Sequence, residues 1–161
     1  MDGSPSHDPS LLLMACSQRK TPGMARGRAW DVYDGQLFRI LKNLFRERAD
    51  WKPSLRILII SARHGVLEPD QVIATYDERL TPVLARARGD LWKCPLRRQV
   101  TARCYRAVHV NLGKIYLSVL PDLESLAPGT PIDRAKGGIG VRNSQTRRWV
   151  LEQLAHSGKS S

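Results

Sequence analysis

The chain has 161 residues, a length typical of one domain whose core needs neither disulfides nor metals. Lys and Arg number 26 against 15 acidic residues, giving a formal net charge of +11. Such a charge favours phosphate-bearing partners, although a basic protein without a nucleic-acid role can share it. The three cysteines form no CxxC pair, which argues against a zinc or disulfide framework and for a reducing, cytoplasmic compartment. No apolar run approaches the ~20 residues of a membrane span, so no membrane partner is expected.

Strands and helices alternate along the predicted domain, which covers residues 11–155 between a disordered lead (1–10) and a disordered tail (156–161). In chain order we expect a buried strand at 11–16, a basic loop at 17–30, a helix that begins at about residue 34 and is broken at Pro53, a strand at 55–60 and a turn at 66–70. Residues 83–106 are expected to be helical, with a break at Gly89 or Pro95. A strand at 107–112, a short helix at 114–120, a Pro-rich connection at 121–132 that can include an edge strand, and a last helix at 143–155 follow. This order predicts an α/β fold: a single three-layer domain with a mostly parallel central sheet flanked by helices.

Chemically active side chains follow the first two predicted strands. Cys16, Ser17, Arg19 and Lys20 follow the first, and Ser61 and His64 follow the second. Because the carboxyl ends of parallel strands meet at one crevice, we expect these side chains to face one another around an anionic ligand.

Each of these residues also has a purely structural interpretation. Cys16 is a nucleophile or ligand contact, or an inert buried thiol. Arg19 and Lys20 pair with a phosphate, or belong to a solvated loop. His64 serves as general acid or base, or only shapes its loop through a hydrogen bond.

Further candidates lie later in the chain. Tyr76 and Asp77 follow a short apolar run, and Asp77 can orient His64, hold a ribose hydroxyl or cap a helix. Asn111 ends the third strand, where its amide can read a base edge or an oxyanion or simply form a turn, and Tyr116 follows. His109 is expected only to lie on one face of the sheet.

A glycine-rich segment precedes the last predicted helix. Lys136, Gly137 and Gly138 can hold a phosphate at the amino end of that helix, although the segment is neither a Walker A motif nor a Rossmann fingerprint. The structural alternative is a flexible loop.

Several motifs resemble a known family. They are Cys16-Ser17-x-x-Lys20, Tyr33-Asp34-Gly35-x-Leu37-Phe38, Ser61-Ala62-x-His64-Gly65-Val66-Leu67-x-Pro69 and Tyr76-Asp77. This pattern is similar to the small bacterial proteins of unknown function related to the peroxide-stress protein YaaA. The first motif and the Ser61-x-x-His64 step also resemble the core of archaeosine synthase, which attaches lysine to a nitrile-bearing deazaguanine base in tRNA. The resemblance implies an α/β fold with a ligand cleft centred on a nucleobase or deazaguanine.

Together these features predict an enzyme that acts on a nucleotide or modified nucleoside. Hydrolysis of the N-glycosidic bond is the leading reaction, and a base-modifying transferase with a Cys16 adduct is the alternative. Two other classes stay open: a non-catalytic nucleic-acid-binding stress protein, and a partner module with vestigial site residues. Neither a metal nor a cofactor is expected, and the sequence indicates no oligomeric state. The expected partner is a nucleotide or a nucleoside, with a nucleic acid as the alternative. The predicted catalytic residues are His64, Cys16 and Asp77, and the predicted binding residues are Ser17, Arg19, Lys20, Ser61, Tyr76, Asn111, Tyr116, Lys136, Gly137 and Gly138.

Overall fold

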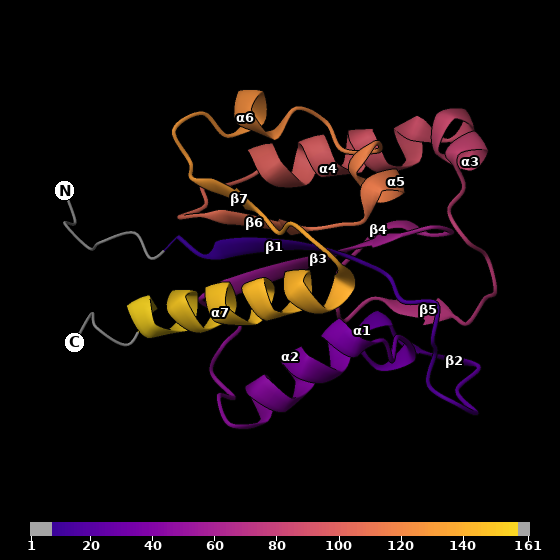
Figure 1. Ribbon diagram of the computed structural model, residues 1–161, viewed down its shortest axis with the longest axis horizontal. Coiled ribbons are helices and arrows are strands. Elements are labelled where there is room, and N and C mark those ends of the chain that lie inside the picture. The colour runs from indigo at the N-terminus through magenta and orange to yellow at the C-terminus, as the bar shows by residue number, and fades with distance from the viewer. Residues whose placement is uncertain (1–7, 158–161) are drawn as a thin grey trace.

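The computed structural model describes residues 8–157, which are built around a five-stranded sheet in the order β4-β3-β1-β6-β7 (Figure 1). Its strands are β1 (Ser10–Ala15), β3 (Leu55–Ser61), β4 (Gly65–Leu67), β6 (Val108–Asn111) and β7 (Ile132–Arg134). β1 pairs in parallel with β3 on one side and β6 on the other, and β7 extends the sheet in parallel beyond β6. β4 runs antiparallel against β3. The predicted α/β fold with a mostly parallel sheet is therefore confirmed.

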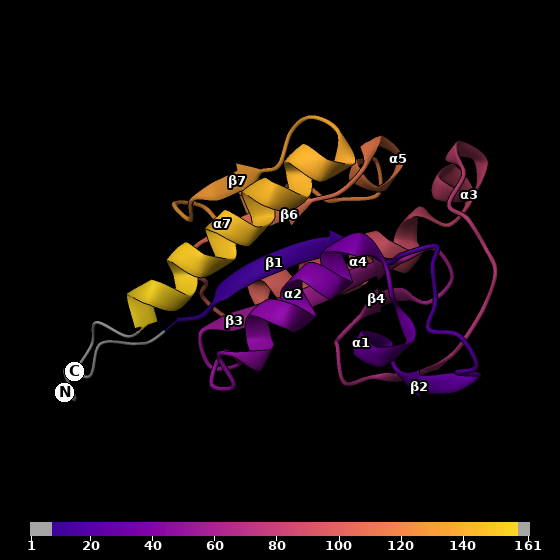
Figure 2. The same cartoon turned by 60° about the horizontal axis from the view of Figure 1, so that its bottom comes forward.

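Helices cover both faces of the sheet. In chain order they are α1 (Ala29–Val32), α2 (Gln36–Arg46), α3 (Pro82–Ala87), α4 (Gly89–Thr101), α5 (Lys114–Leu117), α6 (Leu123–Leu126) and α7 (Ile139–Ser157). α2 and α7 lie against one face, and α4, α5 and α6 lie over the other (Figures 1 and 2). No helix among the described residues combines the length and apolar character needed to cross a membrane.

The core follows from the two-residue period of the strands. Leu12 and Met14 of β1 pack with the α2 and α7 side, whereas Leu11 and Leu13 pack with the α4 side. Both faces of the sheet are covered, so β1 and β3 are continuous apolar runs rather than alternating ones. Large buried side chains of the helices fill the two layers: Phe38, Leu41, Trp149 and Val150 on one side, and Trp92, Leu96 and Val100 on the other.

The basic segment 17–30 is only partly the loop that the sequence predicts. β2 (Arg26–Arg28) pairs antiparallel with β5 (Val72–Ala74) in a separate two-stranded sheet, and α1 follows directly. The Arg-Gly-Arg sequence of β2 has no alternation of apolar and polar residues, and β5 has only three residues, at a position where the sequence predicts no element. Their long-range pairing, which single-sequence periodicity does not report, forms both strands.

Other boundaries also differ from the predictions. The helical region over 83–106 breaks between α3 and α4, beside Gly89, but Pro95 lies inside α4, and helix ends at Thr101. The predicted turn after His64 contains the short strand β4, and the Pro-rich connection contains α6 as well as the edge strand β7. The last helix, α7, starts at Ile139 rather than residue 143.

The predicted lead and tail fall largely outside the described residues, at 1–7 and 158–161. Where they are described, Ser10 already belongs to β1 and His156 still belongs to α7. Ser10 is buried, and its hydroxyl is satisfied because it donates to Oε1 of Gln153 on α7 at 2.6 Å. Ser10 and His156, which the prediction places in the lead and the tail, therefore belong to regular structure.

Candidate functional site

A cavity of about 290 Å³ opens at the carboxyl ends of β1 and β6. The chain after β1 continues into α1 and α2 on one face, whereas the chain after β6 continues into α5 and α6 on the other. Connections that leave adjacent parallel strands toward opposite faces create a crevice between the strand ends. The polar side chains that line this first cavity are Cys16, Ser17, Gln36, Asn111, Tyr116, Arg142 and Asn143.

A second cavity, of about 260 Å³, adjoins the first. Cys16, Ser17 and Tyr116 line both. The charged side chains that the second cavity adds are Lys20, Asp77, Glu78 and Arg79. We call the two cavities together the cleft, and Cys16 and Tyr116 stand where they meet.

Cys16 and Tyr116 form the closest pair of reactive groups in the cleft. Sγ of Cys16 lies 3.2 Å from the hydroxyl oxygen of Tyr116. Burial, followed by the nearby Cys16, raises the pKa of Tyr116 above its ordinary value, so the phenol keeps its proton near neutral pH. The arrangement offers a thiol nucleophile beside a neutral hydroxyl donor.

Two helices begin at the first cavity, and a helix amino end carries a partial positive charge. Neither α2 nor α7 carries an acidic residue in its first turn, so nothing within that turn offsets the partial positive charge of either amino end. Arg142 lies in the first cavity, where Nη1 donates to the carbonyl of Leu112 at 2.9 Å. Its buried Nε has no hydrogen-bond partner among the described residues. These donors favour an anionic group.

Ser61 lies in a hydrogen-bonded cluster beside the cleft rather than on its wall. Its buried Oγ lies 3.2 Å from the hydroxyl of Tyr33 and 2.9 Å from that of Tyr76, and the two phenols are 2.7 Å apart. The same Oγ accepts from the backbone N–H of His64 at 3.0 Å. Burial raises the pKa of Tyr33 to about 12 and also raises that of Tyr76. The Ser61 hydroxyl is therefore already occupied within the protein.

His64 lines neither cavity. Its ring packs edge-on against Tyr76, with 5.1 Å between centroids, and its buried Nε2 has no partner among the described residues. No hydrogen bond joins His64 to Asp77 within the described chain. The structure thus places Cys16 and Asp77 on the cleft wall, whereas His64 packs against Tyr76 and lines neither cavity.

A family model matches residues 11–148, from β1 into α7. The chain belongs to a family of unknown function (DUF6884). The matched span contains every residue that lines the two cavities of this DUF6884 chain. No curated protein and no solved structure matches the chain.

The predicted cations of the DUF6884 chain have different surroundings. Nζ of Lys20 lies 4.4 Å from the ring centroid of Tyr76, so its charge is held at the second cavity by a cation–π contact. Arg19 is exposed and forms an ion pair with Asp34 at 3.3 Å, outside both cavities.

The glycine-rich segment contributes through the helix that follows it. Gly137 and Gly138 directly precede α7, as predicted, and Gly137 has a φ of +101°. Lys136 is exposed and lines neither cavity. Ile139 and Arg142, one turn later, reach the first cavity instead.

The wall behind Asn111 is built from residues whose role the sequence did not indicate. Asn111 donates to Oδ1 of Asn143 at 3.1 Å and to Oγ1 of Thr146 at 2.8 Å. Thr146 also contacts His109, which lies two residues before Asn111 and on the same face of β6. The two-residue spacing places His109 and Asn111 on one face of the strand, which the sequence could have shown, but their partners Thr146 and Asn143 come from α7.

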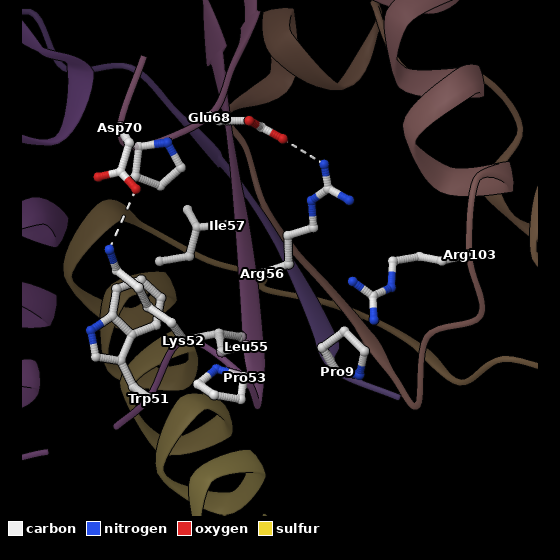
Figure 3. Close-up of a pocket in the computed structure, with 11 residues that line it drawn as sticks. Pro9, Trp51, Lys52, Pro53, Leu55, Arg56, Ile57, Glu68, Asp70 and Arg103 are labelled. Atoms are coloured by element: carbon white, nitrogen blue, oxygen red, sulfur yellow. Dashed lines mark hydrogen bonds and ion pairs between the residues drawn. The ribbon is translucent and has the colours of Figure 1, made fainter. Parts of the chain in front are cut away.

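A larger cavity, of about 480 Å³, lies near the amino end of β3 (Figure 3). Its charged walls include two ion pairs, Arg56 with Glu68 at 2.6 Å and Lys52 with Asp70 at 3.4 Å. It has no thiol or imidazole. Among the described residues, no three His, Cys, Asp or Glu side chains gather as a metal site. We therefore take the cleft at Cys16 as the candidate site.

Proposed function

We propose that this chain is an enzyme that binds a nucleotide or modified nucleoside phosphate in the cleft and hydrolyses its N-glycosidic bond. The observation that carries the proposal is the position of Cys16, 3.2 Å from the Tyr116 hydroxyl and at the meeting point of two polar cavities. One of these cavities lies at the amino ends of α2 and α7. An anionic group and a reacting group therefore find separate, adjacent places.

The phosphate is assigned to the first cavity. Backbone N–H groups at the amino ends of α2 and α7, together with the Arg142 side chain, supply donors and positive potential there. The base or sugar then extends past Cys16 toward Lys20 and Asp77 in the second cavity. The motif resemblance to YaaA-related proteins and to archaeosine synthase supports a nucleobase ligand within this proposal.

In the proposed reaction the bond between C1′ and the base nitrogen breaks, water supplies the hydroxyl to C1′, and a proton goes to the base. Asp77 is a suitable group to activate the water, since it lines the second cavity and no described residue pairs with it. Tyr116 keeps a proton that it can donate as a hydrogen bond. Cys16, which lines both cavities, contacts the sugar or the base in this scheme, so its removal misplaces the bond that breaks. The three free cysteines support a reducing, cytoplasmic setting.

The experiment incubates the protein with ribonucleotides, deoxyribonucleotides and deazaguanine nucleotides and detects released base by mass spectrometry. We expect base release to disappear in Cys16→Ala and Asp77→Asn. It should persist in Cys94→Ala, a matched control because Cys94 is an exposed cysteine on α4. Release that persists in both cleft variants contradicts the proposed site. A covalent mass increase on Cys16 without base release favours the transferase instead.

A non-catalytic nucleic-acid-binding protein is the second candidate, and α4 favours it. Lys93, Arg97 and Arg98 are exposed on this helix, and none forms an ion pair within the described chain. Exposed, unpaired cations bind phosphate backbones with a strong dependence on salt. This function predicts that replacing the three cations by Gln weakens binding to tRNA or DNA, while Cys16→Ala leaves that binding unchanged.

A further inference from the structure

A row of buried hydrogen bonds joins a surface carboxylate to the first cavity. Oδ2 of Asp133 lies 2.7 Å from Nδ1 of His109, and Nε2 of His109 lies 2.8 Å from Oγ1 of Thr146. The same Oγ1 accepts from Nδ2 of Asn111 at 2.8 Å. His109 and Thr146 are fully buried, whereas the Asp133 side chain is 62% exposed. Trp149 stacks on the His109 ring and fixes its plane.

The direction of each bond in this row follows from what each group can donate. An ionised carboxylate only accepts, so Nδ1 of His109 carries a proton. Burial lowers the pKa of His109, although Asp133 opposes this, so at neutral pH the ring is uncharged and Nε2 accepts. Thr146 has one hydroxyl proton and two neighbouring acceptors, Nε2 of His109 and the Arg142 carbonyl at 3.0 Å. The hydroxyl therefore has no proton for Asn111, and the Asn111 amide must donate to it.

Both amide protons of Asn111 are consequently used inside the protein, the second on Oδ1 of Asn143. Oδ1 of Asn111 accepts no hydrogen bond from the described residues, and Asn111 lines the first cavity. A carbonyl oxygen at the wall of a ligand site is costly to desolvate unless the ligand supplies a donor. Asn111 therefore offers the cleft an acceptor and no free donor.

We propose that Thr146 and Asn143 are positioning residues that hold Asn111 as an acceptor, with Asp133 fixing the tautomer of His109 behind Thr146, so that the cleft selects ligands with an N–H or O–H donor facing it. This inference rests on the proposed function, because it names the group that a nucleotide must present. The donor is either an amino or imino hydrogen of the base or a hydroxyl of the ribose.

The row itself is tested by nitrogen-15 NMR of the histidine ring, without any ligand. Wild type should show His109 as the neutral tautomer with the proton on Nδ1. Asp133→Ala removes the exposed acceptor and should move that proton to Nε2, since Thr146 can then accept it and donate to Arg142. A wild-type ring protonated on Nε2, or one that Asp133→Ala does not change, overturns the role of Asp133 in fixing the His109 tautomer.

Selectivity is tested by calorimetry with AMP and GMP against two kinds of analogue. Purine riboside 5′-monophosphate has no base N–H, and 2′,3′-dideoxyadenosine 5′-monophosphate has no ribose hydroxyl. We expect one of these changes to weaken binding to wild type by about tenfold, which identifies the donor. Thr146→Val frees the Asn111 amide to rotate and should reduce this ratio toward one. Thr101→Val, which removes an exposed hydroxyl from α4, should leave it unchanged.

Each outcome has a distinct meaning. Equal affinities for all four nucleotides in wild type, or an unchanged ratio in Thr146→Val, overturn the selectivity. Failure of any nucleotide to bind overturns both the proposed function and the ligand part of this inference. The tautomer of His109 decides the positioning row separately in that case.

Discussion

Replacement of Ser61 by Ala should destabilise the protein without touching the wall of the cleft. Ser61 is fully buried, and its hydroxyl contacts the phenols of Tyr33 and Tyr76 and accepts from the backbone N–H of His64. In Ser61→Ala the two phenols keep only each other, and the His64 N–H loses its partner. Each buried polar group left without a partner costs about 1–3 kcal/mol. We therefore expect a loss of about 2–3 kcal/mol in unfolding free energy and of about 4–12 °C in Tm.

Urea denaturation followed by tryptophan fluorescence measures this loss. Ser118→Ala is the matched control, because its hydroxyl bonds to the Ile115 carbonyl at an exposed position and should change stability by less than about 0.5 kcal/mol. A Ser61→Ala protein as stable as this control would refute the reasoning. It would show that the Tyr33–Tyr76 pair is satisfied without Ser61. A normal stability combined with lost nucleotide binding would return Ser61 to the role of ligand contact.

Three further predictions concern stability. Because burial raises the pKa of Tyr33 to about 12, the unfolded chain loses this proton first. Stability is therefore complete below about pH 10 and falls by up to about 3 kcal/mol as the pH rises through 12. Tyr33→Phe should flatten that fall in urea titrations between about pH 9 and 12. Because burial lowers the pKa of His109, the unfolded chain binds a proton first on acidification. The contribution of His109 to stability is therefore complete above about pH 6.5 and falls below it. An NMR titration that gives this ring an ordinary pKa would contradict the prediction. Gly65→Ala should lower the unfolding free energy by about 2 kcal/mol or more in chemical denaturation. Gly65 has a φ of +80°, and an added Cβ would lie 2.8 Å from the Leu91 carbonyl oxygen, which lacks its helical donor because residue 95 is proline. An unchanged free energy would mean that α4 moves aside easily.

The amino-acid sequence by itself determined the order of the main elements. The apolar runs that become β1 and β3, and the helical spacing of Leu41, Leu44 and Phe45, are local patterns that survive in the fold. The strand-end rule then placed Cys16, Asn111 and Tyr116 in one crevice, since that rule needs only the order and direction of the strands.

Tertiary structure alone decided which candidates line the cleft. Ser61 and His64 follow a buried strand just as Cys16 does, but they make hydrogen bonds and ring contacts with Tyr33 and Tyr76 from distant segments and line neither cavity. Arg142 and Asn143 enter the site because α7 starts before residue 143, where glycines weakened the helical signal. Which atom of the Asn111 side chain is left for the cleft depends on hydrogen-bond partners up to 35 residues away in the chain. A local sequence pattern reports which groups a segment carries, whereas the partners that occupy them come from segments that only folding brings together.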